Sequence, residues 1–332
     1  MADYNFLIEI GGTYFALYKK NGGLVLKERS VLAVSKKDEK ITVKAFGTEA
    51  EKLERINDPN IYVFSPFSDG TVANEEYAKL LISHFLKKAD IKKKFLKELS
   101  CVLSTCCGLN QNDKQQYRNL FYACGIENVA FVSGVYLVAL ANDMKKFSKN
   151  NFVIDMGGNY VDVALVDFEG VNFGATLPFG SRNINLSLIE LVQKKYKLEL
   201  PAFLAEDIKV ELASVYDNDI SSMKIQVYEP SIDSTITTMV YASDLKEVIM
   251  PYLDEILKLV ETTLNMLDEN QLAWIKQNGI ILSGGMSKIA GVEEYFKSKL
   301  TLPIKMTDDC ENACIIGGSI LLSNKEILKQ FI

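Results

Sequence analysis

Two segments in different halves of the chain share one unusual pattern, and this repetition constrains the fold more than any other feature. Each has an apolar run, an acid, one apolar residue, two glycines, a polar residue and a second apolar run: FLIEIGGTYFALY at 6–18 and FVIDMGGNYVDVALV at 152–166. Strands favour apolar and β-branched residues, so a charge and two glycines inside such a run predict a tight turn.

Each copy therefore predicts a β-hairpin whose turn, Gly11–Gly12 or Gly157–Gly158, uses the positive φ that glycine allows. Two similar hairpins indicate a duplicated α/β architecture with two related halves that face each other. A third pair, Gly284–Gly285, follows an apolar strand in 278–300 and precedes an expected amphipathic helix. Backbone N–H groups at such a helix start can face a ligand.

The rest of the chain alternates between expected helices and strands, as an α/β fold requires. Helices are expected in 75–89, 115–125, 183–196 and 202–216, and one or two more in 243–267, with Pro251 at a break. Strands are expected near 98–106 and 128–134, and a short antiparallel excursion in 224–243.

The glycine turns favour a phosphate site. Without a Cβ, a turn lets its N–H groups approach a phosphate closely. Glu9 and Asp155 stand two residues before the glycines, and a carboxylate there would repel phosphate unless a divalent cation such as Mg²⁺ lies between them. The alternative is two ordinary turns with exposed acids. A single hairpin would favour that alternative, but two matched hairpins and a third glycine pair favour a polyphosphate site.

Composition excludes several other functions. The chain has 332 residues and a net charge of −6, which gives no general attraction to nucleic acid. Six cysteines without CxxC spacing and the single His84 argue against zinc and against histidine-based catalysis. Only four of the 37 basic residues are arginines, so a phosphate site is expected to rely on backbone N–H groups and a cation. No export signal or membrane span is recognised, and we expect a cytoplasmic protein.

With these motifs in this order, the sequence resembles the bacterial MreB family of actin-like, rod-shape-determining proteins. IEIGGTYFALYKKNGGLVLKERSVLAV resembles the first phosphate hairpin of that family, and VIDMGGNYVDVALVD the second. SPFSDGTVANEEYAKLL, AEDIKVELASVY, GIILSGGMSKIAGVEEYF and NACIIGGSILL are similar to further family segments in the same order along the chain.

The resemblance implies an actin-like (ribonuclease H-like) duplicated two-domain α/β fold with an interdomain nucleotide cleft. The first domain would comprise 1–150 plus 308–332, with 32–63 as a small subdomain. The second would comprise 151–307, with 185–239 as its subdomain. The resemblance further implies filaments involved in cell shape, contacts with other cell-shape or filament proteins, and binding of ATP or ADP with Mg²⁺.

The resemblance also implies which residues bind the nucleotide. Glu9 and Asp155 would hold the metal, directly or through water, and Glu206 and Lys209 would face the ribose. The full expected set is Glu9, Gly11, Gly12, Thr13, Asp155, Gly157, Gly158, Asn159, Glu206, Lys209, Gly284, Gly285 and Met286.

The chain departs from the family around the phosphates. It has Glu9 where the family has Asp, Tyr14 in the first turn, Asn159 and Tyr160 in the second, and Met286 in place of a third glycine. The acidic segment whose glutamate orients the attacking water is replaced by 133–135, Ser-Gly-Val. Loss of such a group costs on the order of 10²–10⁴ in rate. No catalytic residue is assigned, and hydrolysis is expected to be weak or lost.

A membrane contact is also suggested by the sequence. Three lysines at 92–94 directly precede Phe95 and Leu96, near the position where MreB-like proteins carry an apolar membrane-facing loop. Exposed Phe95 and Leu96 beside these lysines would suit an anionic lipid surface. The equal alternative is a solvated helix end with both side chains packed inward.

Three other functions are alternatives to a nucleotide-binding filament protein. A small-molecule kinase of the same superfamily needs a carboxylate base, for which Asp162 and Asp69 are the only candidates. A nucleotide-free scaffold could keep the fold as a partner of another filament protein. An Hsp70-like chaperone is disfavoured because the chain leaves no room for a substrate-binding domain.

Overall fold

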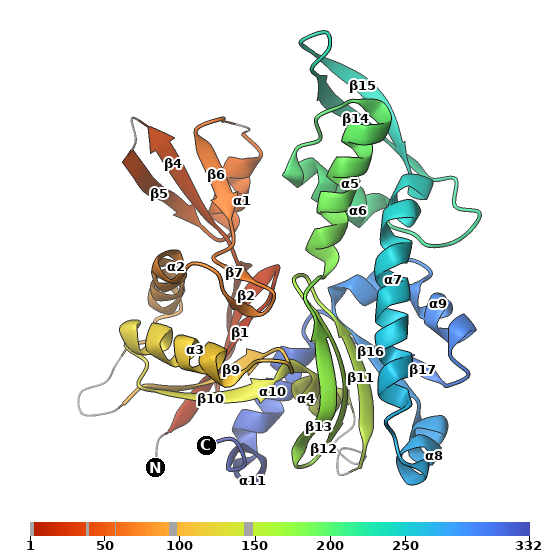
Figure 1. The fold of residues 1–332 in the computed structure, drawn as a ribbon. Helices are drawn as coiled ribbons and strands as arrows, with labels where there is room; N and C mark the ends of the chain where they lie inside the picture. Colours follow the sequence, from red (N-terminus) through yellow and green to blue (C-terminus); the bar gives the residue numbers. More distant parts are fainter. Residues whose placement is uncertain (1–2, 38–39, 57, 93–97, 143–148) are drawn as a thin grey trace.

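The computed structural model describes residues 3–37, 40–56, 58–92, 98–142 and 149–332. It contains two five-stranded sheets with the same topology (Figure 1). In each, three consecutive antiparallel strands are followed by two parallel ones, in the order β3-β2-β1-β9-β10 and β13-β12-β11-β16-β17. The expected α/β class and the duplication of the halves are therefore confirmed. Phe95 and Leu96 lie outside the described residues.

The strands of the first sheet are β1 (Tyr4–Ile10), β2 (Tyr14–Lys19), β3 (Gly23–Arg29), β9 (Ser100–Thr105) and β10 (Asn128–Ser133). Those of the second are β11 (Asn151–Met156), β12 (Val161–Asp167), β13 (Gly170–Leu177), β16 (Ile280–Ser283) and β17 (Ile304–Met306). Both expected hairpins are present, as β1–β2 and β11–β12.

Helices cover the outer face of each sheet, where apolar side chains from both form a core. The first sheet carries α2 (Glu75–Lys88) and α3 (Gln111–Ala123). The second packs against α7 (Ala242–Leu264) and α9 (Val292–Lys299), with α8 (Glu269–Asn278) alongside. Pro251 lies within α7, which continues through it as one helix.

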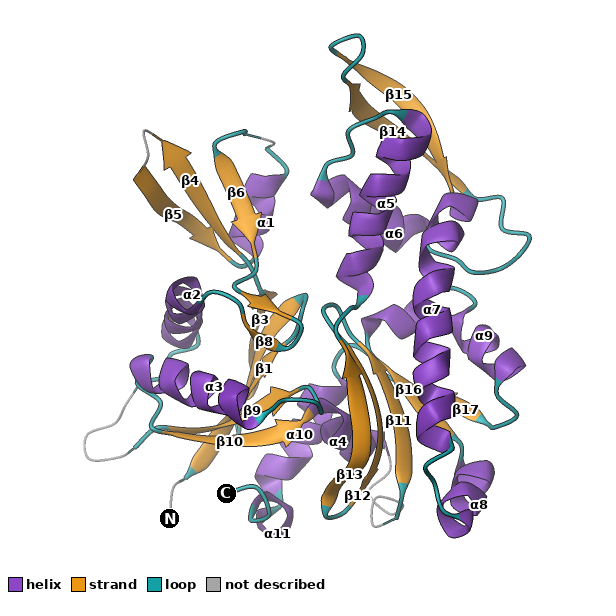
Figure 2. Ribbon diagram, viewed as in Figure 1, coloured by secondary structure: helices purple, strands orange, loops and turns teal. Residues whose placement is uncertain are grey.

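A smaller α/β unit stands above each sheet (Figure 2). The first has the sheet β5-β4-β6, formed by β4 (Leu32–Lys37), β5 (Lys40–Phe46) and β6 (Ile61–Phe64), with α1 (Thr48–Glu54). The second has α5 (Ser181–Tyr196), α6 (Ala202–Leu212) and the hairpin of β14 (Ser222–Glu229) and β15 (Ser234–Tyr241). A two-residue pair, β7 (Phe67–Ser68) with β8 (Thr71–Val72), precedes α2.

Two apolar helices join the halves. α4 (Gly134–Asn142) and α10 (Ala313–Ser323) lie between the two sheets and pack against each other, and α11 (Lys325–Leu328) follows α10. Their side chains form a third core with Leu7 from β1 and Val153 from β11. The helices approach so closely that a Cβ on Gly317 would lie 1.9 Å from the carbonyl oxygen of Leu137. This contact fixes the distance between the sheets and thus the width of the space above them.

Within the described residues, no helix combines the length and the apolar character needed to cross a bilayer.

Replacing Gly317 by alanine tests the packing of α4 against α10. The added methyl group would overlap the Leu137 carbonyl, and overpacking of this kind costs about 1–3 kcal/mol. We expect a loss at the upper end, measured by urea unfolding, because backbone cannot move aside as a side chain can. Ile316→Ala, on the exposed side of the same helix, is the control and should cost less than about 1 kcal/mol. Unchanged stability of Gly317→Ala would contradict this packing.

Candidate functional site

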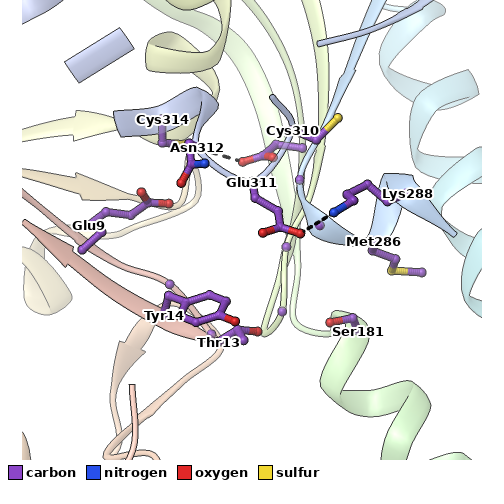
Figure 3. A pocket seen from close by; sticks show the side chains of 18 of the residues that line it. Glu9, Thr13, Tyr14, Ser181, Met286, Lys288, Cys310, Glu311, Asn312 and Cys314 are labelled. Atoms are coloured by element: carbon purple, nitrogen blue, oxygen red, sulfur yellow. Dashed lines mark hydrogen bonds and ion pairs between the residues drawn. The ribbon is translucent and has the colours of Figure 1, made fainter. Parts of the chain in front are cut away.

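A cavity of about 470 Å³ opens between the halves, with Cys314 at the start of α10 in its wall. This volume lies in the usual range of small-ligand sites. Figure 3 shows Glu9, Thr13 and Tyr14 reaching the cavity from the first half and Ser181, Met286 and Lys288 from the second. Twelve of the thirteen residues expected from the sequence line the cavity: Glu9, Gly11, Gly12, Thr13, Asp155, Gly157, Gly158, Glu206, Lys209, Gly284, Gly285 and Met286. Asn159 does not.

The two glycine turns, one from each half, contact each other directly at the cavity. A Cβ on Gly12 would lie 2.4 Å from the backbone nitrogen of Asn159, and one on Gly158 would lie 2.5 Å from Oγ1 of Thr13. No real side chain tolerates such distances, so only glycine allows the turns to touch. The sequence-based explanation was wrong here. None of the four turn glycines has a positive φ, and close approach, not backbone conformation, requires them.

Asn159 helps to close this contact instead of lining the cavity. Its backbone nitrogen faces Gly12, and its side-chain Nδ2 donates to the carbonyl oxygen of Phe67 at 3.4 Å. Asn159 therefore ties the second turn to the first half.

The start of α5 holds the second turn in place. The N–H groups of Ser181 and Arg182 donate to the carbonyl oxygens of Gly157 and Gly158, each at 3.0 Å. The Arg182 guanidinium also reaches the carbonyl oxygen of Gly12, at 3.3 Å. Because the turn carbonyls are engaged in this way, both turns are fixed without a ligand.

Glu9 and Asp155 occupy equivalent positions on β1 and β11. Burial, together with the negative charge of Asp155, raises the pKa of Glu9 to about 8, although Lys27 opposes the shift. Burial and the charge of Asp162 raise the pKa of Asp155 to about 7, against a hydrogen bond from Ser283. Two carboxyl groups whose negative charges are unfavourable in these surroundings form a site where a divalent cation would be favoured.

The donor set fits Mg²⁺ in its usual protein setting, where one or two carboxylates act together with waters and phosphate oxygens. Glu9 and Asp155 would supply the carboxylates. Within the described part of the chain, no three His, Cys, Asp or Glu side chains gather where they could hold a metal without such help.

α6 provides a charged pair on the far wall. Lys209 donates to Glu206 at 2.8 Å and to the carbonyl oxygen of Ser181 at 3.1 Å, and Asn185 also donates to Glu206. Burial raises the pKa of Glu206, but Lys209 and these hydrogen bonds outweigh it, so the pKa lies below its ordinary value. The carboxylate of Glu206 is therefore ionised and held rigidly beside the cavity.

The third glycine pair differs from expectation. After Gly284 the chain forms a short 3₁₀ helix, η1 (Gly285–Lys288), and α9 begins only at Val292, so no α-helix N-terminus faces the cavity here. Gly284 has φ 85°, and a Cβ on it would lie 2.3 Å from the carbonyl oxygen of Met156. Here glycine is required both by backbone conformation and by contact with β11.

Several cavity residues were not expected from the sequence: Tyr14, Ala16, Lys27, Arg29, Tyr160, Ser181, Val210, Ala213, Lys288, Ile289, Cys310, Glu311, Asn312 and Cys314. Arginines lie closer to the expected phosphate site than their low number in the sequence indicated. Arg29 lines the cavity, Arg182 contacts the first turn, and Arg55 lies nearby. The strand alternation of LVLKER, which puts Lys27 and Arg29 on one face of β3, was the available signal.

An ion pair joins the two smaller units above the cavity. Arg55, at the end of α1, donates to both carboxylate oxygens of Asp207 on α6, at 2.7 and 2.8 Å, and its guanidinium lies 5.5 Å from the centre of the Phe203 ring. The 152 residues between the partners make this a link between the halves.

Asp162 and Asp69, the two candidate bases for a small-molecule kinase, do not line the cavity. Asp162 is fully buried beneath the cavity, where Thr176 Oγ1 and the N–H of Cys107 donate to it at 2.6 and 2.9 Å. Asp69 lies in the exposed β7–β8 turn. Ser133, Gly134 and Val135 do not line the cavity either.

A duplicated α/β fold with paired glycine hairpins around a central cavity defines the actin-like class of proteins, and solved actin-like structures match this fold (Figure 1). The model of one family in this class, described as MreB/Mbl protein, matches residues 3–330. The chain belongs to the MreB/Mbl family.

Individual relatives agree with this assignment. The cell shape-determining protein Mbl of Bacillus subtilis strain 168 is 24% identical over 328 residues, which cover 97% of each chain. The crystal structure of MreB5 of Spiroplasma citri bound to ADP is similar with a TM-score of 0.87 and 21% identity, covering 99% of this chain and 98% of that one. The MamK double helical filament gives a TM-score of 0.79 at 17% identity, covering 96% and 99%.

The buried acids predict an unusual pH dependence of stability. Glu9 has a folded-state pKa of about 8 against an ordinary 4.5, so its unfavourable contribution grows as pH rises between these values. In nucleotide-free protein, the unfolding free energy of Glu9→Gln should exceed that of wild type by more at pH 9 than at pH 5. Because Glu9 partly faces the open cavity, we expect a gain on the order of 1–2 kcal/mol.

Glu206→Gln is the matched control, with the opposite sign. The pKa of Glu206 is lowered by Lys209, so its carboxylate stabilises the fold above its unfolded pKa, and that stabilisation is lost as pH falls. This variant should be less stable than wild type at pH 9. Urea unfolding at both pH values measures the two effects, and parallel pH profiles for both variants would contradict the assignment.

Proposed function

We propose that this chain binds ATP or ADP together with Mg²⁺ in the cavity and assembles into filaments that act in cell shape, as a cytoplasmic protein with weak or absent hydrolysis. The division into domains belongs to the same proposal: 1–150 plus 308–332 with subdomain 32–63, and 151–307 with subdomain 185–239. The packing of α10 on α4 and β1 supports placing the C-terminal segment in the first domain.

The meeting of the two glycine turns carries the nucleotide proposal. Both turns bring backbone without side chains to one end of the cavity, and each is preceded by a carboxylate suited to Mg²⁺. The cavity is also lined by the Glu206–Lys209 pair, which offers polar groups to a sugar, and by the glycine turn before η1, to which we assign the base. The MreB5 protein of Spiroplasma citri, similar in fold, was solved bound to ADP.

Weak hydrolysis is supported by the carboxylates of the cavity. Among the described lining residues they are Glu9, Asp155, Glu206 and Glu311. Glu206 is paired with Lys209, Glu311 with Lys288, and the other two are the metal candidates. No carboxylate of this set is left to orient a water molecule, and Ser133–Val135 supplies none.

A nucleotide-free scaffold is the second candidate, favoured by one observation. The turns touch, and the Arg182 guanidinium donates to the carbonyl oxygen of Gly12, so direct protein contacts join the halves at the turns. A small-molecule kinase is disfavoured because Asp162 and Asp69 lie outside the cavity wall.

Calorimetric titration of nucleotide-stripped protein tests the proposal. We expect ATP and ADP to bind with Mg²⁺, and Gly158→Val to abolish binding because its side chain would collide with Thr13 where the phosphates approach. The rate of phosphate release should be lower, by a factor on the order of 10²–10⁴, than that of an MreB protein that retains the acidic segment.

Electron microscopy of concentrated protein with and without ATP separates the two candidates. Filaments that need nucleotide support the first. Filaments without any detectable nucleotide binding support the scaffold, and brisk phosphate release would refute weak hydrolysis.

Contact of Phe95 and Leu96 with an anionic membrane surface is also retained as a proposal, and it rests on the sequence alone. Co-sedimentation with anionic liposomes tests it: Phe95→Ser/Leu96→Ser should pellet less than wild type, and equal pelleting would refute the contact.

A further inference from the structure

The first sheet presents a row of side chains to the cavity. Strand pairing sets Glu9 on β1 opposite Ala16 on β2, and Ala16 opposite Lys27 on β3. All three line the cavity. Because Ala16 has only a methyl group, the long side chain of Lys27 has room to lean across β2 toward the cavity.

Tyr14 and Arg29, the next pair of facing residues on β2 and β3, add a second cation beside Lys27. Tyr14 lies opposite Arg29 in the same strand pairing, and both line the cavity. The Lys27 Nζ atom lies 4.9 Å and the Arg29 guanidinium carbon 5.2 Å from the centre of the Tyr14 ring. Both distances are within the range of cation–π contacts, so the ring positions the two cations beside the first glycine turn.

Neither cation has its hydrogen-bonding capacity filled by the described residues. Lys27 donates to Asn312 Oδ1 at 2.7 Å and lies 3.9 Å from Glu311, yet an ammonium group has three donors. Arg29, whose side chain is 19% exposed, forms an ion pair with Glu51 at 3.2 Å, but its Nε has no hydrogen-bond partner among the described residues. Largely buried cations with spare donors are costly unless an anion completes them.

The surrounding charges also leave the positive charge of this wall incompletely neutralised. After the larger effect of burial, the positive charge of Arg29 lowers the pKa of both Arg182 and Lys209. The nearby carboxylates Glu206 and Glu311 are already held by lysines of the second half, at 2.8 and 2.7 Å. The wall formed by the first sheet therefore carries positive charge that a polyanion in the cavity would neutralise.

We propose that Lys27 and Arg29, positioned against Tyr14, bind the phosphate groups of the nucleotide, so that phosphate is held by side-chain cations as well as by turn N–H groups and metal. This inference rests on the proposed nucleotide site. Its consequence is that nucleotide binding survives removal of divalent metal, because two protein cations share the task of neutralising the phosphates.

Calorimetric titration with ATP plus Mg²⁺, ATP plus EDTA, and adenosine tests the proposal. Wild type should bind ATP in EDTA within about tenfold of its affinity in Mg²⁺. Lys27→Met and Arg29→Met should each weaken ATP binding in EDTA by at least about tenfold and leave adenosine binding unchanged. Tripolyphosphate should compete with ATP on wild type and not on the double variant.

Lys19→Met is the matched control, since Lys19 is an exposed lysine of β2 outside the cavity wall. It should bind ATP like wild type. Thermal unfolding without nucleotide checks that each variant is folded, and the charge-conserving pair Lys27→Arg and Arg29→Lys replaces any variant that is not. These should retain binding in EDTA.

Two results would overturn the inference in different ways. If wild type binds ATP and Lys27→Met and Arg29→Met bind it equally well in EDTA, these residues do not hold phosphate, although the nucleotide site stands. If wild type binds neither ATP, ADP nor adenosine under any condition, the proposed function fails, and this inference fails with it.

Discussion

The contact between the two glycine turns is the constraint on which the rest of the cavity depends. Gly12 and Gly158 let backbone touch backbone across the two halves, and any side chain would separate them. The sheets can approach this closely because α4 and α10 pack tightly between them, with Gly317 against Leu137. Small residues at two levels, the turns and the central helices, thus set the dimensions of the cavity from above and below.

Charge is distributed unequally between the two walls. The two lysines that the second half contributes to the cavity are both paired, Lys209 with Glu206 and Lys288 with Glu311. The first half places Lys27 and Arg29 over an aromatic ring and leaves them with spare donors. A ligand that is anionic at one end and neutral at the other would find complementary surroundings in one orientation only, which is the asymmetry that a nucleotide has.

Much of this arrangement was accessible from the sequence, for identifiable reasons. The two hairpins follow from local strand and turn preferences, and the duplication follows from their similarity. Twelve of the thirteen expected site residues line one cavity: ten lie in or beside three glycine turns that converge, and Glu206 and Lys209 lie on α6. The contacts between residues far apart in the chain could not be predicted from the sequence. The reason for the turn glycines is a contact between residues such as Gly12 and Asn159, far apart in the chain, and the roles of Lys27 and Arg29 depend on strand register. The helix expected after Gly285 is present as α9, but it begins only at Val292 because the residues of η1 first form a short 3₁₀ turn.

The ion pair between Arg55 and Asp207 differs in kind from the other contacts that join the halves. The turns meet through uncharged backbone, and α4 meets α10 through apolar side chains, whereas this pair is charged and partly exposed, at 47% and 33%. Attraction between exposed charges weakens as dissolved salt increases, with a screening length of about 8 Å at physiological ionic strength. The smaller units are therefore held together by the only one of these three contacts that responds to the electrolyte, so the ionic composition of the cell acts on the upper part of the cleft and leaves its floor unchanged.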